Sequence, residues 1–450
     1  MLGIAGVGMS GLAKLAQDRG DTVTGCDLEG GAVLEELRGR GIPCSVGHSP
    51  EHIDGSEIVV RSTAVPCSEP EILEAYRRQK VVLTRGRFLT KILPDKEIIG
   101  VTGSHGKTTT TWLISALLIR GGFDPSVIVG GRVKELGGNH RSGKGQYFVA
   151  ELDESNGSHL EATPLYSVLT NIDREHTDYY TSPAKIRTSF EEYVRAAKPA
   201  GCVFGCWDDP LVKDILQVLG SERRWRSYGL SPDAEFTADD FQHGTDLMSF
   251  TVKRCGTALG RVRMRLPGEH NATNALAAIA VALEVGVPWD VITSTLAEVS
   301  GVDRRQEFLG AAGGVRVYDD YGHHFTEVKA LLRAMRTRIK GRMIGIFQPH
   351  RFTRTKDLYA EFGDAFTGLD QLFVMPIYAA CEEPIDGVSS QLIVDAVKAN
   401  GQVRVESSDN PVHQVLGVLQ PGDTVITIGA GNVWRVGVTI LDELRRRSCQ

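Results

Sequence analysis

The sequence predicts an α/β protein of roughly three domains. Its 450 residues are too many for a single hydrophobic core. Two stretches, residues 2–11 and 98–111, each have the pattern of a strand, a glycine-rich loop and a helix. In the last third of the chain, two further apolar strands each run into a cluster of charged residues and histidines. This alternation of strands and helices is typical of a mostly parallel sheet.

Composition narrows the class of protein further. A hydrophobic content of 42% and a charged content of 24% describe an ordinary globular protein, and the net charge of -6 argues against a general nucleic-acid binder. The longest apolar run is far short of the ~18 residues of a membrane span, and residues 1–20 lack the pattern of a signal peptide. We therefore expect a cytoplasmic protein without membrane insertion, whose eight scattered cysteines are reduced.

The first strand, loop and helix have two interpretations. Residues 2–5 are predicted to form a strand that enters a G-x-G-x-x-G loop at residues 6–11. A second strand at residues 22–26 ends at Asp27, about 20 residues on, where dinucleotide-binding domains carry a ribose-binding acid. No residues typical of hydride transfer follow. After a third strand at residues 57–60, Ser62 and Thr63 could instead hold the diphosphate of a nucleotide-linked substrate; a fourth strand is predicted at residues 80–84.

The second such unit predicts a phosphate-binding loop. After a strand at residues 98–101, glycines allow backbone N–H groups to approach phosphate oxygens, and the start of the following helix adds partial positive charge. Lys107 can reach the terminal phosphates, and the Thr108 hydroxyl is placed to bind Mg²⁺. The predicted nucleotide-binding residues of this loop are Gly103, Ser104, His105, Gly106, Lys107, Thr108 and Thr109.

Polar residues follow the next two predicted strands of this central region. Glu151 and Glu154 come after the strand at residues 146–150 and compete to hold Mg²⁺, directly or through water. His176 follows the strand at residues 166–170 and is a second candidate metal-associated residue.

An alanine-rich helix begins near residue 267, after a region of short β-like segments at residues 201–265. Asn271 and Asn274 lie one turn apart on it, so both amides share one helical face and could bind an adenine edge. The alternative is that Asn271 caps the helix and Asn274 is merely exposed.

Two polar clusters mark the last domain. A strand at residues 315–318 runs into residues 319–324, and a strand at residues 343–347 runs into residues 348–356. Ligands of open α/β sheets gather at the carboxyl ends of strands. Arg351 and Arg354 have the forked geometry that suits a carboxylate.

Taken together, these motifs resemble those of the Mur ligase family over nearly the whole chain. In order they read GVGMSGLA, GSHGKTTTT, ELDES, TNIDREHTD, GEHNATNALAA, GVDRRQEF, YDDYGHHFTE, FQPHRFTRTKDL and YAACEEPIDG. The resemblance implies a Rossmann-like N-terminal domain at residues 1–95 that binds a UDP-linked substrate. It further implies a central P-loop ATPase domain with a parallel sheet at residues 96–308, and a C-terminal Rossmann-like α/β domain at residues 309–450 that binds an amino acid.

The resemblance also implies an activity, namely ATP-driven amide bond formation in peptidoglycan synthesis. The lactyl carboxylate of UDP-N-acetylmuramate would become an acyl phosphate, which the amino group of L-alanine attacks, with release of ADP and phosphate. ATP and Mg²⁺ would be required, and we expect a monomer or weak homodimer. The alternatives are a murein-recycling ligase that adds a preformed peptide, a dinucleotide-dependent oxidoreductase and a nucleotide-sensing binding protein.

Carried over motif by motif, the resemblance assigns roles to individual residues. Lys107 and Thr108 would serve the ATP phosphates and Mg²⁺, and Glu151, preferred to Glu154 because it ends the strand, would hold a second Mg²⁺ with His176. The adenine would lie against Asn271 and Asn274, and ATP would also contact Arg305 and Asp320. The incoming amino acid would be surrounded by Tyr321, His323, His350, Arg351 and Arg354. The UDP-linked substrate would be held by Gly6, Gly8, Met9, Ser10, Gly11, Asp27, Ser62 and Thr63. The expected catalytic residues are Lys107, Glu151, His176, Arg305, Asp320 and His323.

Overall fold

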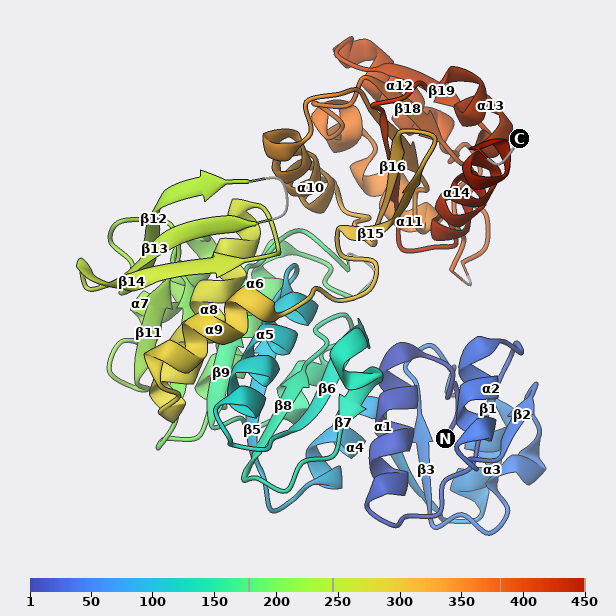
Figure 1. Cartoon of the computed structure of the whole chain (residues 1–450). Coiled ribbons are helices and arrows are strands. Elements are labelled where there is room, and N and C mark those ends of the chain that lie inside the picture. The colour runs from blue at the N-terminus through green and yellow to red at the C-terminus, as the bar shows by residue number, and fades with distance from the viewer. Residues whose placement is uncertain (177–178, 245–246, 381, 449–450) are drawn as a thin grey trace. The chain divides into compact units, whose positions relative to one another are not determined.

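A computed structural model describes residues 1–176, 179–244, 247–380 and 382–448 of the chain (Figure 1). The chain divides into two compact units, and each is considered by itself. The first unit contains residues 1–240, 250–262 and 273–299, and the second contains residues 241–249, 263–272 and 300–450. The division passes through helix α8 (Glu269–Val285).

The N-terminal part of the first unit is a small parallel α/β arrangement. Strands β1 and β2 pair in parallel, as do β3 and β4, and Leu2 bridges the two pairs through Cys26 and Arg61. Its elements are α1 (Val7–Asp18), β1 (Gly25–Asp27), α2 (Ala32–Gly39), β2 (Cys44–Val46), the 3-10 helix η1 (Pro50–Ile53), β3 (Ile58–Arg61), α3 (Pro70–Arg77), β4 (Val81–Thr84) and α4 (Arg85–Ile92).

Two sequence predictions for this part are wrong. Of the strand expected at residues 2–5, only Leu2 pairs, through isolated bridges to Cys26 and Arg61, because Gly3 turns the chain at a φ of 71°. The glycine loop is also shorter than predicted: Gly6 is the N-cap of α1, so Gly8, Met9, Ser10 and Gly11 are helical. Gly8 and Gly11 serve close packing instead, since an added Cβ would lie 2.5 Å from the Arg85 Nη1 and 2.8 Å from the Asn139 Nδ2, respectively.

A larger sheet lies mostly in the middle part of the first unit and has the order β14-β13-β12-β11-β10-β9-β5-β8-β6-β7. One end of each of the strands β12, β13 and β14 belongs to the second unit. The pairs from β6 to β11 are parallel, and β7 pairs antiparallel with β6. Its strands are β5 (Glu97–Thr102), β6 (Ser126–Val133), β7 (Gly138–Arg141), β8 (Tyr147–Glu151), β9 (Tyr166–Leu169), β10 (Cys202–Cys206), β11 (Trp225–Tyr228), β12 (Phe236–His243), β13 (Met248–Arg254) and β14 (Thr257–Met264).

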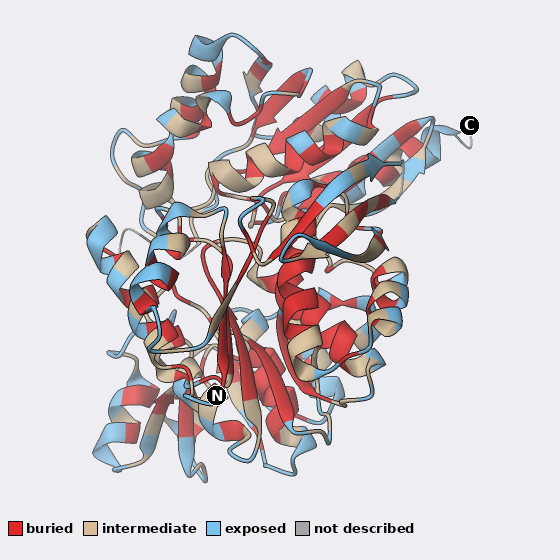
Figure 2. Cartoon of the chain, turned by 90° about the vertical axis from the view of Figure 1, so that its left-hand side faces the viewer, coloured by how far each residue is buried: buried red, intermediate tan, exposed pale blue. Residues whose placement is uncertain are grey.

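Helices cover both faces of the parallel strands, which are largely buried (Figure 2). The crossover from β5 to β6 runs in one direction along the sheet and that from β9 to β10 runs in the other, so right-handed connections put α5 and α6 on opposite faces. The helices are α5 (Lys107–Arg120), α6 (Pro183–Arg195), α7 (Pro210–Leu219), α8 and α9 (Trp289–Glu298), with short η2 (Lys134–Leu136) and η3 (Ser158–Glu161). The helix α5 starts after a short loop, residues 103–106, which follows the carboxyl end of the buried strand β5.

The second unit contains a six-stranded sheet with the order β15-β16-β20-β17-β18-β19, parallel except for β15. Its strands are β15 (Glu307–Ala312), β16 (Val315–Asp320), β17 (Met343–Phe347), β18 (Gln371–Val374), β19 (Arg404–Ser407) and β20 (Thr424–Ile428). Its helices are α10 (Phe325–Arg338), α11 (Phe352–Leu358), η4 (Ala360–Asp364), α12 (Gln391–Asn400), α13 (Pro411–Val418) and α14 (Trp434–Ser448). The predicted strand at residues 343–347 is confirmed as β17, whereas Asp319 and Asp320 end β16 instead of following it.

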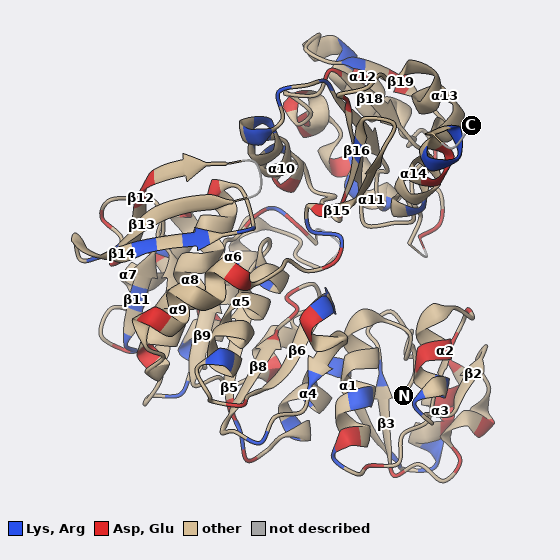
Figure 3. Cartoon of the chain, in the orientation of Figure 1, with Lys and Arg blue, Asp and Glu red and all other residues tan. Residues whose placement is uncertain are grey.

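Three features bear on the compositional predictions. In the part of the chain that the structure describes, no helix combines the length and apolar character needed to cross a membrane. The six described cysteines are free, and Cys381 and Cys449 lie outside the described residues. Charges of both signs occur in each unit (Figure 3).

Candidate active site

The loop between β5 and α5 is held from outside by residues that follow β9. The backbone N–H groups of Ser104 and His105 donate to the carbonyl and the side-chain Oδ1 of Asn171, at 2.9 and 2.8 Å. The His105 carbonyl accepts from the Thr170 Oγ1 at 2.7 Å, and the Ser104 Oγ accepts from the Asp173 N–H at 2.8 Å. The shape of the predicted phosphate loop therefore depends on Thr170, Asn171 and Asp173 at the end of the neighbouring strand. The sequence analysis identified this strand end but did not predict these contacts.

Two glycines of this loop have no room for a side chain. Gly103 has a φ of 127°, and an added Cβ would lie 2.2 Å from the Thr170 Oγ1. Gly106 has a φ of 80°, and its Cβ would lie 2.6 Å from the Asn274 Oδ1. Both positions combine left-handed backbone with a close approach, which only glycine accommodates.

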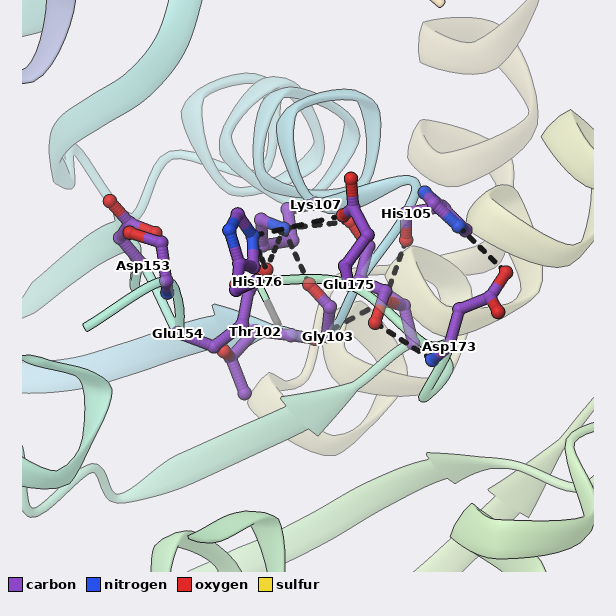
Figure 4. Close-up of polar contacts among 12 residues, drawn as sticks. Thr102, Gly103, His105, Lys107, Asp153, Glu154, Asp173, Glu175 and His176 are labelled. Atoms are coloured by element: carbon purple, nitrogen blue, oxygen red, sulfur yellow. Dashed lines mark hydrogen bonds and ion pairs between the residues drawn. The ribbon is translucent and has the colours of Figure 1, made fainter. Parts of the chain in front are cut away.

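Lys107 turns back over this loop and is mostly buried, with 15% of its side chain exposed. Its Nζ donates to the carbonyls of Gly103 and Ser104 at 2.5 and 2.9 Å and to the Glu154 Oε1 at 2.9 Å (Figure 4). Burial opposes its charge, but the charges of Glu154, Glu151 and Glu175 outweigh burial and raise the pKa of Lys107 above its ordinary value. The lysine is therefore a fixed cation at the mouth of the loop.

Glu154, Glu175 and His176 form a compact group beside Lys107, with one ligand atom of each within 4.8 Å of the others. The His176 Nε2 lies 3.3 Å from the Glu154 Oε1 and 3.7 Å from the Glu175 Oε2. The second oxygen of Glu154 is buried and accepts no hydrogen bond from the described residues. Two buried carboxylates, one with an unsatisfied oxygen, fit a divalent cation that prefers oxygen ligands.

The protonation of His176 follows from the same contacts. Burial opposes its charged form, but the hydrogen bond to Glu154 and the charge of Glu175 outweigh burial and raise the pKa of His176. The protonated imidazole is therefore stabilised while no metal ion competes for the carboxylates.

Glu151, the preferred metal ligand in the sequence analysis, has a different contact. Its Oε2 accepts a hydrogen bond from the Gly130 N–H at 2.8 Å, and it is absent from the carboxylate and histidine group formed by described residues. Its metal role stays a prediction, and the geometry favours Glu154. Glu175, which precedes His176, was not singled out; its position beside a candidate ligand was the available signal.

The structure argues against the alternative in which Asn271 caps the helix and Asn274 is merely exposed. Thr108 and Thr109 lie buried in the first turn of α5. Asn274 is buried and its Oδ1 accepts from the Thr110 Oγ1 at 3.2 Å, so it is not merely exposed. Asn271 lies inside α8 and donates to the Pro267 carbonyl at 2.8 Å, so it is not the helix cap. Contact of both amides with adenine remains a prediction.

In the second unit, Asp320 is held by backbone groups. Its carboxylate accepts from the N–H groups of Gln306 and Gly322 at 2.8 and 2.7 Å, and burial raises the pKa of Asp320 to about 6. The Arg305 guanidinium lies 3.5 Å from the Glu327 Oε1 and 5.2 Å from the centroid of the Tyr321 ring. Arg305, Asp320 and Tyr321 are thus brought to one end of β16.

The predicted amino-acid residues gather nearby in this unit. The rings of His323 and His350 lie 5.5 Å apart, and the Arg354 Nη1 is 3.1 Å from the His350 Nδ1. Arg351 has a φ of 72°, and its Nε lies 3.9 Å from the Glu382 Oε1. Glu382 was not singled out from the sequence.

A partly buried arginine in this unit was also missed. The Arg304 Nε lies 2.9 Å from the Asp319 Oδ2, and its Nη2 donates to the Gly429 carbonyl at 2.5 Å. Arg304 therefore joins the ends of β16 and β20, next to the predicted Arg305.

The predicted UDP-binding residues differ in their hydrogen bonds and in how far they are exposed. The Asp27 Oδ2 accepts from the Ala5 N–H at 2.8 Å, which ties β1 to the glycine turn. The Ser62 Oγ accepts from the Ala64 N–H at 3.3 Å, and Thr63 is exposed. Met9, Ser10 and Gly11 are buried in α1, so their predicted substrate contacts are not supported by surface access.

An ion pair links the N-terminal and middle parts of the first unit. The Arg85 Nη2 in α4 donates to the Asp153 Oδ2 at 2.8 Å. Burial opposes ionisation of Asp153, but the charge of Arg85 and the hydrogen bond from Ser155 outweigh it, and the pKa of Asp153 falls to about 2. Asp153 directly precedes Glu154 of the group beside Lys107.

Three family models match the chain in succession. The Mur ligase family catalytic domain matches residues 1–96, the Mur ligase middle domain matches residues 101–282, and the Mur ligase glutamate ligase domain matches residues 304–431. With relatives about 40% identical over nearly all of the chain, these matches show that it belongs to the Mur ligase family.

Similar proteins carry more specific names. A protein named UDP-N-acetylmuramate–L-alanine ligase from Geobacter sp. (strain M21) is 40% identical over 99% of this chain and 97% of its own length. A protein of that name from Syntrophus aciditrophicus is 41% identical over 99% of this chain and 93% of its own length. The crystal structure of a UDP-N-acetylmuramate-alanine ligase from Thermotoga maritima is similar with a TM-score of 0.84 and 26% identity, covering 100% of this chain and 99% of the other.

Replacing Glu154 by glutamine tests the group beside Lys107. The substitution removes the Glu154 charge, one of the two carboxylate charges that raise the pKa of His176. Burial and the charge of Glu175 remain, so the histidine pKa is expected to fall. In the unaltered protein, this histidine stabilises the fold fully below pH about 6.5 and loses that contribution as the pH rises through its raised pKa. The measurement is an NMR titration of the His176 ring in the ligand-free protein.

The matched control is Glu151→Gln, because Glu151 contacts the Gly130 N–H instead of His176. The His176 pKa is expected to change less in this control than in Glu154→Gln. Equal shifts in the two variants would contradict the assignment of Glu154 as the direct partner of His176.

Proposed function

We propose that this chain joins L-alanine to the lactyl carboxylate of UDP-N-acetylmuramate, using ATP and releasing ADP and phosphate. The observation that carries the chemistry is the buried Lys107, fixed over a glycine loop and next to paired carboxylates. The identity of the substrates rests on the names of relatives about 40% identical over nearly the whole chain. Such a reaction belongs to peptidoglycan synthesis.

The proposed route activates the carboxylate before the amine attacks. Transfer of the γ-phosphoryl group of ATP to the lactyl carboxylate gives an acyl phosphate, and attack by the alanine amine expels phosphate. Phosphate is a far better leaving group than oxide, so the protein contributes mainly positioning and electrostatic stabilisation. Lys107 suits this role, because it can exchange its loop carbonyls for phosphate oxygens as negative charge redistributes.

We assign Mg²⁺ to Thr108, His176 and the carboxylates of Glu154 and Glu175, with Glu151 retained as the alternative carboxylate. When bound, Mg²⁺ supplies positive charge that offsets the phosphate oxygens. The buried Glu154 oxygen without a hydrogen-bond partner among the described residues supports this assignment. The side chains of Arg305 and Asp320 and the amides of Asn271 and Asn274 are proposed to contact ATP.

The amino acid is proposed to bind the second unit at Tyr321, His323, His350, Arg351 and Arg354. The approach of Arg354 to His350 and of Arg351 to Glu382 provides both positive charge and a carboxylate, which suits a zwitterion. Gly6, Gly8, Asp27, Ser62 and Thr63 are proposed to serve the UDP-linked substrate. We expect a monomer or weak homodimer in the cytoplasm.

The proposed reaction predicts that phosphate release requires three substrates together. Phosphate release from ATP should appear only when both UDP-N-acetylmuramate and an amino acid are present. The rate of release with L-alanine should exceed the rates with glycine and L-serine. A preformed peptide tests the recycling alternative in the same assay. Strong ATP hydrolysis that is unaffected by UDP-N-acetylmuramate would contradict the ligase proposal.

Replacing Lys107 by alanine should lower turnover by about 10²–10³-fold, because a charge aimed at developing negative charge is lost. Phosphate release at saturating substrates measures the effect. The control is Lys185→Ala, which removes an exposed lysine from α6 and should leave turnover near normal. Near-normal turnover in Lys107→Ala would show that the phosphate loop is misassigned.

Replacing Arg351 by lysine keeps the charge but removes forked pairing with a carboxylate. The KM for alanine should rise roughly tenfold or more, the effect of losing one charge-assisted hydrogen bond, while the KM for ATP changes little. Arg333→Lys is the control, since Arg333 is exposed on α10. Equal increases in both KM values would instead favour contact with phosphate.

A further inference from the structure

A second group of potential metal ligands lies in the N-terminal part, away from the phosphate loop. Cys26 comes from β1, His48 follows β2, and Glu71 lies in the first turn of α3. The Cys26 Sγ is 3.6 Å from the His48 Nδ1 and 3.5 Å from the Glu71 Oε1, and the two latter atoms are 2.8 Å apart. Residues separated by 22 and 45 positions along the chain thus present three ligand atoms to one point.

These separations approach those of a tetrahedral zinc site. With bonds of about 2.3 Å to sulfur and about 2.0–2.1 Å to nitrogen and oxygen, tetrahedral angles place ligand atoms roughly 3.3–3.6 Å apart. The distances from the Cys26 Sγ to the His48 Nδ1 and the Glu71 Oε1, 3.6 and 3.5 Å, lie within this range. Only the His48 and Glu71 atoms are closer, because a hydrogen bond now joins them. Replacing that hydrogen bond by an ion requires a separation of these two atoms by about half an ångström.

Only one of the two carboxylate oxygens of Glu71 has hydrogen-bond partners among the described residues. Its fully buried Oε1 accepts from the Ser49 N–H at 2.9 Å and contacts His48 and, at 3.2 Å, the His52 Nδ1. Its Oε2 is equally buried and has no hydrogen-bond partner among the described residues. A buried carboxylate with an oxygen that lacks a partner is costly, and a cation bound by the Glu71 carboxylate would offset its buried negative charge.

The chemistry of the group selects the kind of ion. A thiolate and an imidazole favour zinc and similar transition metals over Mg²⁺, which prefers oxygen. A divalent ion held by one thiolate and one carboxylate is electrically balanced, as a buried site requires. In the absence of metal, burial and the Glu71 charge raise the pKa of the Cys26 thiol to about 12, so binding must release the thiol proton.

We propose that Cys26, His48 and Glu71 bind one zinc ion, with water in the fourth position and His52 orienting the Glu71 carboxylate. On binding, the Cys26 S–H bond breaks, its proton passes to solvent, and the sulfur electron pair forms the bond to zinc. No change of oxidation state is involved.

Such an ion would brace the turn that carries the proposed UDP-binding residues. The Cys26 carbonyl accepts from the N–H groups of Gly3 and Ile4 at 2.9 and 3.1 Å, and the adjacent Asp27 accepts from the Ala5 N–H. Zinc bound at Cys26 would therefore fix β1 relative to η1 and α3. This site rests on its own geometry and does not depend on the proposed ligase reaction.

Cobalt substitution tests the site by a signal that only a thiolate can give. The full-length protein, loaded with Co²⁺ and freed of excess ion, should show a thiolate-to-cobalt charge-transfer band in the near ultraviolet. The Glu154, Glu175 and His176 group contains no sulfur, so it cannot produce this band. Zinc loading followed by elemental analysis should give one more bound ion in the unaltered protein than in Cys26→Ser.

The control is Cys202→Ser, since Cys202 is also a buried thiol whose pKa burial raises to about 12. This variant should keep the cobalt band and the bound zinc. His52→Gln should retain the band but weaken zinc binding by about 10–100-fold, as expected for a residue that orients a ligand. Absence of the band in the unaltered protein, or its persistence in Cys26→Ser, would overturn the proposal, and the first result does not depend on how any variant folds.

Discussion

A buried positive charge organises the centre of the first unit. The Lys107 ammonium is withdrawn from water at the end of β5, and a buried cation is stable only when opposite charge and hydrogen-bond acceptors surround it. Glu154 arrives from the end of β8 and Glu175 from beyond β9, the two strands that flank β5. The loop carbonyls of Gly103 and Ser104 complete the set. The two strands on either side of β5 thus lead to the carboxylates that neutralise Lys107.

The regular elements could be predicted where local pattern and tertiary structure agree. The apolar run at residues 343–347 became β17 with the predicted ends, and the strand before the phosphate loop and the helix after it are confirmed as β5 and α5. The prediction was wrong at residues 2–5, because the positive φ of Gly3 and the early start of α1 leave only the bridge at Leu2. Short apolar segments do not reveal such turns.

The side-chain partners were less predictable than the elements. Glu151 was preferred for ending a strand, yet the loop after β8 turns Glu154 towards Lys107 and leaves Glu151 on the Gly130 N–H. Asn171 holds the phosphate loop although 66 positions separate it from His105. The cysteines appeared scattered along the sequence, but the fold gathers Cys26, His48 and Glu71. Each of these contacts depends on how the fold brings separate parts of the chain together, which the spacing of residues in a motif does not reveal.

Arg85 connects two regions that bind different groups in the proposed function. Its Nη1 lies 2.5 Å from the position that a Cβ on Gly8 would take at the start of α1. The same guanidinium pairs with Asp153, the neighbour of Glu154. Any ligand at the start of α1 that changes the free energy of this ion pair must change the electrostatic potential next to Lys107. Thermodynamic linkage makes the effect reciprocal, so phosphate bound at Lys107 must change the affinity of that ligand by the same factor. If the proposed sites at α1 and Lys107 are occupied, this one arginine would make their occupancies mutually dependent, even without contact between the two ligands.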